Sequence, residues 1–319
     1  MILFLSDDRE SEMDLVAGMR AGLRAGAWAV LAFALGGGAL PGLAGEAIPH
    51  GQGLLFEVER EGSPASHVFG TMHSADPEIT ALPEPVEEVF RVAAAVGVEV
   101  VLAPGTDAAL RGAMLLDADR DLEALVGSEL FGRVAEAGAD YGLPARHLRT
   151  FKPWALVTLF SLPRAELMRG RADQRLDHEL QRRAQDQGLP VFGLETVAEQ
   201  IDVFDGLDRA AQVELLEAAL DQQPQIEDWW VATRRAYLER DTASLYGLML
   251  EQSAAGDPEL AARFLARLLD RRNERMVERM APRLAAGRAF IAVGALHLPG
   301  ERGVLRLLEE RGYEVTRVY

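Results

Sequence analysis

The sequence of 319 residues contains no cysteine. This absence excludes disulfide bonds, zinc sites built from thiolates, and a cysteine nucleophile. It leaves the compartment open, because a protein without cysteine suits reducing and oxidising surroundings equally well.

Basic residues are few relative to acidic ones. The chain carries 33 Lys and Arg against 50 Asp and Glu, which gives a net charge of -17. Binding to nucleic acid requires a basic face that displaces counterions from the phosphates, and no stretch rich in Lys and Arg offsets this charge. The sequence therefore predicts no nucleic-acid partner. With 49% hydrophobic residues, the chain can instead bury a substantial core.

One long apolar stretch stands near the N-terminus. Residues 25–45 (AGAWAVLAFALGGGALPGLAG) follow Arg20 and Arg24 and end in small residues, which is typical of a secretory signal. The short apolar core and the Gly and Pro near its end favour cleavage, with Ala44 or Ala47 as the last residue removed. We therefore expect an exported protein, periplasmic or secreted, in which residues 1–47 precede a single domain spanning residues 48–319.

Two alternatives to the signal remain open. The stretch could be a buried helix, or an uncleaved anchor that would be the chain's membrane contact. The acidic opening of residues 1–15 does not fit a signal. Translation starting at Met13 or Met19 would place the arginines first.

The pattern after Gly53 predicts a β-hairpin, followed by a helix at Leu82 to Val96 that Gly97 ends and a buried strand at residues 98–103. The C-terminal part repeats this order. Residues 289–293 (AFIAV) read as a buried strand, residues 303–311 as an amphipathic helix, and residues 313–319 as a closing strand.

These two ends predict the fold class. We expect an α/β protein in which internally duplicated β-α-β units form a central sheet. A large, mainly helical insertion lies between the two halves, at residues 106–141, 153–187 and 208–287, with one strand at Leu189 to Thr196. We assign the charged residues of the helical part to solvated faces without a function.

A Gly-x-x-His turn follows a predicted strand at each end of the chain, at Gly70 to His73 and at Gly294 to His297. Glycine permits a sharp turn, so each imidazole could project into the crevice beyond the strands, where ligands of open α/β sheets bind. Neutral imidazole is a common metal ligand and general base. Each histidine could instead only cap a loop, but their recurrence favours one joint site.

Two glutamates occupy positions where apolar residues are expected: Glu99 inside a strand and Glu195 at the end of another. A buried carboxylate requires a cationic partner, either a metal or an arginine. Glu99 could instead face water from an edge strand. Glu195 could begin a helix that Thr196 and Glu199 cap.

A helix near the C-terminus carries Arg272 and Asn273, and the sequence leaves open whether they face the crevice. For the arginine a surface position is the default expectation. Lys152-Pro-Trp154 reads as a helix start with an aromatic anchor and a structural role.

Five blocks in this order, FGTMH with a following Asp-Pro, KPW, GLETVAEQ, RN..M and VGALHLPGERGVLRLLEERGYEV, resemble the TraB/GumN family, which includes the Tiki metalloproteases. The resemblance extends from about Leu54 to the end of the chain. It implies a fold related to the ChaN and erythromycin-esterase-like proteins, and a metal-dependent protease using manganese or cobalt. The matching positions are His73, Glu99, Glu195, Arg272, Asn273 and His297. Here Val100 and Val101 follow Glu99, without the acidic residue that often stands there.

Our leading hypothesis is an exported metal-dependent hydrolase that acts on a peptide or protein. His73 and His297, with Glu99 or Glu195, would bind a divalent ion of manganese, cobalt or zinc and activate water. The other glutamate would be the general base.

In this hypothesis Arg272, assisted by Asn273, would stabilise an oxyanion. Two other hypotheses remain. One is a hydrolase without metal in which His73 is the base. The other is an exported, non-catalytic binding protein that sequesters a peptide, haem or metal.

Overall fold

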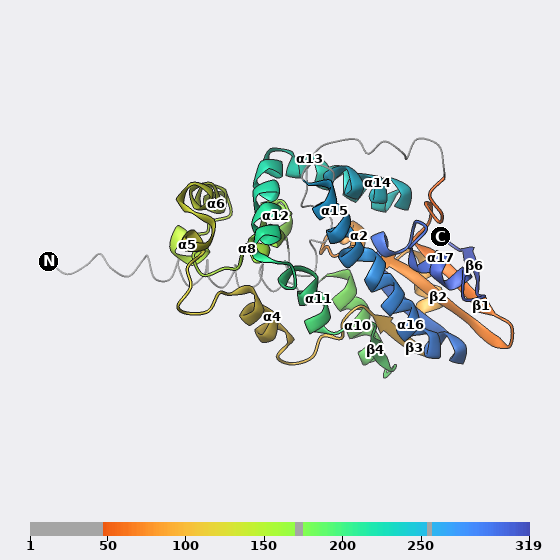
Figure 1. The fold of residues 1–319 in the computed structure, drawn as a ribbon. Coiled ribbons are helices and arrows are strands. Elements are labelled where there is room, and N and C mark those ends of the chain that lie inside the picture. Colours follow the sequence, from red (N-terminus) through yellow and green to blue (C-terminus); the bar gives the residue numbers. More distant parts are fainter. Residues whose placement is uncertain (1–46, 170–174, 254–256) are drawn as a thin grey trace.

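The computed structural model describes residues 47–169, 175–253 and 257–319 (Figure 1). The stretch at residues 25–45 lies outside the described residues, so export stays a prediction. Among the described residues, no helix is long and apolar enough to cross a membrane.

Six strands form one sheet in the order β4-β3-β5-β2-β1-β6. β2 pairs in parallel with β5, β5 with β3, and β3 with β4, whereas β1 is antiparallel to both β2 and β6. The strands are β1 (Leu55–Arg60), β2 (Ser63–Thr71), β3 (Ala95–Val98), β4 (Val191–Gly193), β5 (Ala289–Gly294) and β6 (Glu314–Arg317). The α/β fold class, the N-terminal hairpin and the closing strand are confirmed.

The pairing of β2 with β5 joins segments that are far apart in the sequence. Gly70 stands opposite Val293, and Thr71 opposite Gly294. Because parallel strands end at the same edge of a sheet, the two Gly-x-x-His turns leave the sheet side by side.

The internal duplication is not confirmed. The strand after the first turn, β3, lies on the far side of β5 from β2, whereas the strand after the second turn, β6, lies at the opposite edge beyond β1. The two units therefore run in opposite directions across the sheet.

Helices cover both faces of the sheet. One face packs against α16 (Arg271–Ala286) and α17 (Val304–Glu309) through residues such as Met276, Met280 and Ile291. The other face packs against α3 (Glu84–Arg91) and α10 (Leu176–Asp186) through Phe90, Leu180 and others.

Most of the remaining helices form a largely separate apolar cluster around the buried Trp154, with α5 and α6 farthest from the sheet (Figure 1). α2 instead packs on the sheet side through Ile79, and α13 and α14 contribute to both clusters. These remaining helices are α2 (Pro77–Thr80), α4 (Thr106–Met114), α5 (Leu122–Val126), α6 (Ser128–Asp140), α7 (Ala145–Leu148), α8 (Pro153–Phe160), α9 (Arg164–Leu167), α11 (Val197–Asp205), α12 (Arg209–Gln222), α13 (Ile226–Leu238), α14 (Thr242–Ser253) and α15 (Pro258–Leu265). Short segments are the 3₁₀ turns η2 (Gln223–Gln225) and η4 (Ala295–His297), and the π-helical turn η3 (Ala266–Asp270). The predicted helical insertion is thus confirmed.

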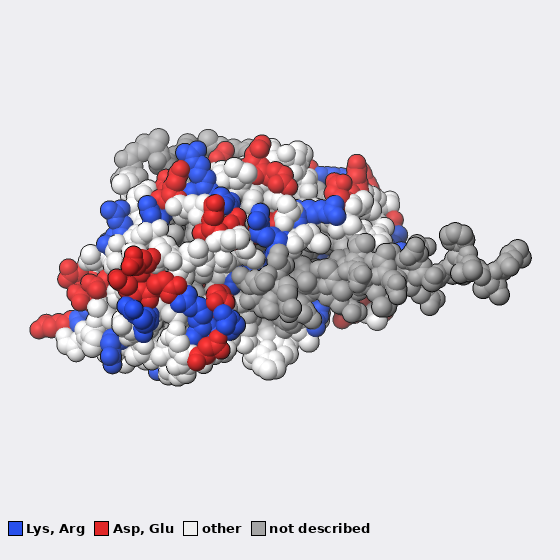
Figure 2. Space-filling view, turned by 180° about the vertical axis from the view of Figure 1, so that it is seen from behind, with Lys and Arg blue, Asp and Glu red and all other residues white. Residues whose placement is uncertain are grey.

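Acidic and basic side chains are interspersed over the face of the molecule shown in Figure 2. No single-signed stripe stands out on that face. The absence of a nucleic-acid partner stays a prediction.

The predicted boundary between helix and strand after Leu82 was wrong. α3 ends at Arg91, and Gly97 lies inside β3 instead of ending the helix. A Cβ at Gly97 would come within 2.7 Å of the Phe192 ring and 2.8 Å of Ile291, so close strand packing explains this glycine. As a result Glu99 lies just beyond the carboxyl end of β3 and not within a strand.

Candidate functional site

The two turns and the segment after β3 form one cavity at the carboxyl ends of neighbouring parallel strands. His73, Glu99 and His297 all line it. A second, smaller cavity shares His73 and Glu99 and is also lined by Asp177 and Gln200. This edge of an open α/β sheet is where such folds bind ligands.

The glycines of the two turns are explained by close packing around them. They are not explained by an unusual backbone conformation. A Cβ at Gly70 would lie 2.6 Å from Leu298 Cδ1, and one at Gly294 would lie 3.2 Å from Glu99 Oε1. Neither glycine has a positive φ. Glycine is therefore needed here so that the two turns and Glu99 can approach one another.

His73 is positioned by an acidic residue from α10. Its Nδ1 lies 2.5 Å from Asp177 Oδ2, and Thr71 Oγ1 donates to Asp177 Oδ1 at 2.6 Å. Burial, the largest single effect, would lower the pKa of His73, but the charge and the hydrogen bond of Asp177, together with the charge of Glu99, outweigh it and raise the pKa above its usual value. Asp177 in turn has a lowered pKa, because His73, Thr71 and His178 together outweigh the effect of burial.

His297 is positioned by an amide from α16. Asn273 Nδ2 donates to the Arg302 carbonyl, so its Oδ1 is the acceptor that lies 2.5 Å from His297 Nδ1. Burial, reinforced by the nearby Arg272, lowers the pKa of His297 to about 3. The ring is therefore neutral, with its proton on Nδ1 and a lone pair on Nε2.

Glu99 faces that lone pair. Its Oε1 lies 3.8 Å from His297 Nε2 and accepts a hydrogen bond from the Gly294 backbone N–H at 2.7 Å. Its Oε2 accepts from Arg272 at 2.7 Å and from Gln200 at 3.1 Å. Burial, the largest single effect, would raise the pKa of Glu99, but Arg272, the two histidines and the hydrogen bond from Gly294 together outweigh it and lower the pKa.

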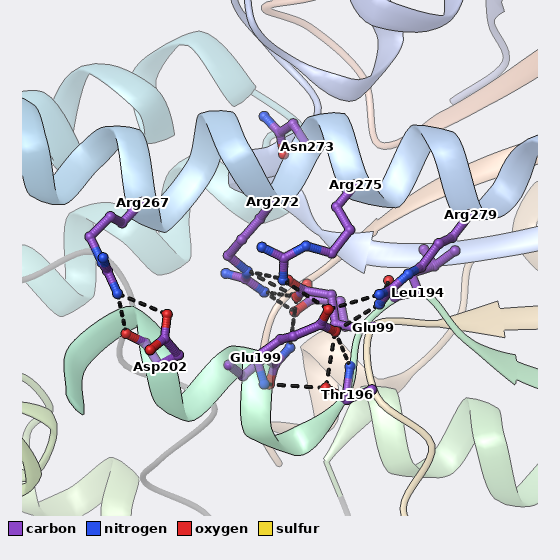
Figure 3. Close-up of polar contacts among 12 residues, drawn as sticks. Glu99, Leu194, Thr196, Glu199, Asp202, Arg267, Arg272, Asn273, Arg275 and Arg279 are labelled. Carbon is purple, nitrogen blue, oxygen red and sulfur yellow. Dashed lines mark hydrogen bonds and ion pairs between the residues drawn. The ribbon is translucent and has the colours of Figure 1, made fainter. Parts of the chain in front are cut away.

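Arg272 is completely buried and lies between two carboxylates. It binds Glu195 through Nε and Nη2, Glu99 through Nη2, and the Leu268 carbonyl through Nη1 (Figure 3). Neither Arg272 nor Glu195 lines the two cavities. The guanidinium therefore holds Glu99 ionised from inside the protein.

Further arginines on the same side of α16 and η3 bind the helix that follows Glu195. Arg279 forms two contacts of 2.7 Å with Glu199, and Arg267 pairs with Asp202 (Figure 3). The capping box of Thr196 and Glu199 predicted from the sequence is present. These contacts fix α11 against α16 and so fix the position of Gln200 beside Glu99.

The wall of the larger cavity comes from two helices of the insertion. α13 contributes Trp230, Thr233 and Tyr237, and α14 contributes Leu245, Met249 and Gln252. The spacings of three, four and seven residues place each set on one helical face. Tyr237 also donates to the Gly70 carbonyl at 3.1 Å, which ties α13 to the first turn.

The imidazole nitrogens and the carboxylate at this site are the kinds of atom that bind a divalent cation. In both His73 and His297 the Nδ1 atom is occupied by a side-chain oxygen, which leaves Nε2 as the available ring nitrogen, as in histidines that bind metals. Glu99 supplies an ionised carboxylate. Within the described ranges, no three His, Cys, Asp or Glu side chains are grouped closely enough to hold an ion as they stand.

The structure places the residues predicted from the sequence in two layers. His73, Glu99 and His297 line the cavity, whereas Glu195, Arg272 and Asn273 are buried behind them and contact them. The default expectation of a surface position for Arg272 was therefore wrong, and Asn273, whose orientation the sequence left open, is buried as well. Their burial follows from partners distant in the sequence.

Sequence reasoning missed Asp177, Thr71, Gln200 and the cavity wall. Assigning all the charged residues of the helical part to solvated faces was wrong, since Asp177 contacts His73 and both Glu166 and Arg175 are buried. No local signal distinguishes Asp177 from the many other acidic residues of the helices. Only the packing of α10 on the sheet identifies it.

A comparison with models of protein families matches residues 54–317 to the TraB/PrgY/gumN family. The matched range covers nearly the whole folded chain and all of the site residues, and it confirms the resemblance found in the sequence. Neither the curated proteins nor the solved structures compared with the chain gave a match.

Proposed function

Because the chain belongs to the TraB/PrgY/gumN family, we propose that it is an exported metal-dependent hydrolase that cleaves a peptide bond. The observation that carries the proposal is the arrangement of the two histidines. Each has its Nδ1 fixed by a side-chain oxygen 2.5 Å away, and both line one cavity with the ionised Glu99. Two imidazoles and a carboxylate are a ligand set of catalytic metal sites.

In this proposal His73, His297 and Glu99 bind the cation, which would be manganese, cobalt or zinc. A cation bound there supplies Lewis acidity towards a carbonyl group and towards water. Asp177 and Asn273 hold the two rings in the tautomer that offers Nε2. Arg272 keeps Glu99 ionised, and the apolar wall of α13 and α14 limits the access of bulk water.

The geometry favours Glu99 over Glu195 as the carboxylate that binds the cation. Glu99 lines both cavities, whereas Glu195 lines neither and is bound by Arg272 and Arg275. We therefore assign Glu195 the role of positioning Arg272. Arg272 is fully engaged by carboxylates and a carbonyl, so in this assignment it acts through Glu99 and not on an oxyanion.

A second candidate, a hydrolase without metal, is favoured by the contact of His73 with Asp177. Asp177 raises the pKa of His73, which makes this ring a stronger base for accepting a proton. Asp177 would orient the ring, as the acidic residue does in other acid-histidine pairs.

Peptide hydrolysis by the mature protein tests the proposal and separates the two candidates. We expect cleavage to stop after treatment with a chelator and to return with manganese, cobalt or zinc. His73→Ala and Glu99→Gln should each abolish cleavage. Cleavage that persists in chelator and is lost in Asp177→Asn would instead establish the second candidate. Absence of cleavage under every condition would contradict both.

A further inference from the structure

The cavity wall contributed by α14 carries one polar side chain among apolar ones. Leu245, Met249 and Gln252 lie on one face of this helix, and all three line the cavity. Leu and Met suit an apolar wall, but an amide does not. Gln252 therefore requires an explanation that packing does not supply.

Gln252 is buried without hydrogen-bond partners. Its exposed fraction is 1%, and within the part of the chain that the structure describes neither Oε1 nor Nε2 of its amide contacts a partner. In native proteins roughly 90% or more of buried backbone polar groups, and the large majority of buried side-chain polar atoms, have a hydrogen-bond partner. A glutamine in which both the donor and the acceptor are unpaired, and which lines a cavity, indicates a ligand that pairs with both.

Another glutamine of this protein shows which group fits such an amide. Gln181 accepts from the Leu102 backbone N–H and donates to the Leu102 carbonyl, both at 2.9 Å. In an extended residue the N–H and C=O point to the same side, so one side-chain amide can bind both of them. The backbone of an extended peptide thus presents the pair that Gln252 lacks.

We propose that Gln252 binds the backbone N–H and C=O of one residue of an extended, uncharged peptide segment in the cavity. This inference rests on the proposed function in taking the cavity as the substrate site, and it adds how the substrate is recognised. Met249, Leu245 and Trp230 surround the apolar side chains of that segment. In the metal-free protein an anionic segment is disfavoured, because the ionised Glu99 lines this cavity.

Gln252 should also destabilise the protein when no peptide is bound, because a buried amide without hydrogen-bond partners is unfavourable. Gln252→Met keeps the length of the side chain and removes both polar atoms. We expect the melting temperature of this variant to rise by about 2–4 °C. A Gln252 that only supported the fold would instead lower the melting temperature when replaced.

Binding of a model peptide, measured by calorimetry in the presence of chelator, tests the recognition itself. The probes are acetyl-Ala-Leu-Ala-amide and three analogues that each carry a methyl group on one backbone nitrogen. In the wild type we expect one analogue to bind about tenfold more weakly than the other two. In Gln252→Met this position-specific loss should disappear. Met249→Leu should shift all affinities together and keep the loss.

Two results of the binding experiment would overturn the proposal. Either no peptide binding by the wild type or an unchanged position-specific loss in Gln252→Met contradicts it. Chelator prevents metal-dependent turnover during the binding measurement, so hydrolysis is measured separately with manganese, cobalt or zinc restored. Position-specific binding in chelator, combined with no hydrolysis in the presence of any of these metals, would contradict the proposed function and leave this inference standing. Hydrolysis in the presence of metal, combined with an unchanged position-specific loss in Gln252→Met, would support the proposed function and contradict this inference.

Discussion

At the scale of single residues, the site depends on one arginine that holds two carboxylates in the interior. Arg272 binds both Glu99 and Glu195, and none of the three side chains is more than 8% exposed. Breaking such a buried pair leaves an uncompensated charge, which costs far more than the loss of a surface ion pair.

Replacing Arg272 should therefore destabilise the fold. We expect Arg272→Met to lower the free energy of unfolding by about 3–5 kcal/mol, measured by urea denaturation. Arg263→Met, at an exposed position of α15, is the matched control and should change it by less than about 0.5 kcal/mol. Equal effects in the two variants would contradict the role assigned to Arg272.

The second residue-scale prediction concerns the pKa of His73. Asp177 raises this pKa while burial opposes it, so Asp177→Asn should lower it. An NMR titration of the His73 ring in metal-free protein measures the change. Asp186→Asn, on the exposed side of the same helix, should leave the titration of His73 as in the wild type. A pKa that stays raised in Asp177→Asn would show that another group is responsible.

How far the residues could be predicted depends on whether their signal is local. His73 and His297 stand in short turns after strands, and Glu99 stands in an apolar context, so the sequence indicates all three. Asp177 and Gln252 lie in helices of ordinary composition. Their role arises from which neighbours the fold brings to them, and that information is not contained in the local pattern.

At the scale of elements, α11 illustrates a helix whose start the sequence predicts in full. Thr196 and Glu199 form the expected capping box. The bidentate contact with Arg279 has the largest effect on the pKa of Glu199, and contacts with Thr196 add to it. Together they lower this pKa to about 2, although burial would raise it. The lowered pKa means that the native state favours the ionised carboxylate.

Stability should therefore depend on pH through Glu199. The stabilisation is fully present above the unfolded pKa of 4.5 and is lost as the pH falls towards about 2. We expect Glu199→Gln to melt at a lower temperature than the wild type at pH 6, and the difference should shrink between pH 4.5 and pH 2. Thermal melts across this range measure it. A difference that stays constant with pH would contradict the assignment.

The element that the sequence misplaced is β3. Alanine and valine before Gly97 are compatible with a continued helix, and glycine is a common helix end. In the structure Gly97 instead allows Phe192 and Ile291 to approach the strand. A packing requirement from β4 and β5 decided the boundary, and both of these strands are distant in the sequence.

At the scale of the whole molecule, the site exists because the two ends of the folded chain meet. β2 and β5 pair in parallel and bring His73 and His297 to one edge of the sheet. The insertion then returns to that edge twice, with α10 supplying Asp177 and with α13 and α14 supplying the apolar wall. The sequence predicted the joint site through its repeated turn, although the duplication it implied is not confirmed.

The central claim is that His73 and His297 act together on one divalent cation. Elemental analysis of the purified protein after loading with manganese, cobalt or zinc, followed by removal of the free metal, measures this most directly. The matched variants are the double substitutions His73→Ala/His297→Ala and His67→Ala/His147→Ala, which each remove two imidazoles. We expect about one ion per chain in the wild type and in His67→Ala/His147→Ala, and none in His73→Ala/His297→Ala. Absence of bound metal from the wild type, or equal metal in both double variants, would contradict the claim.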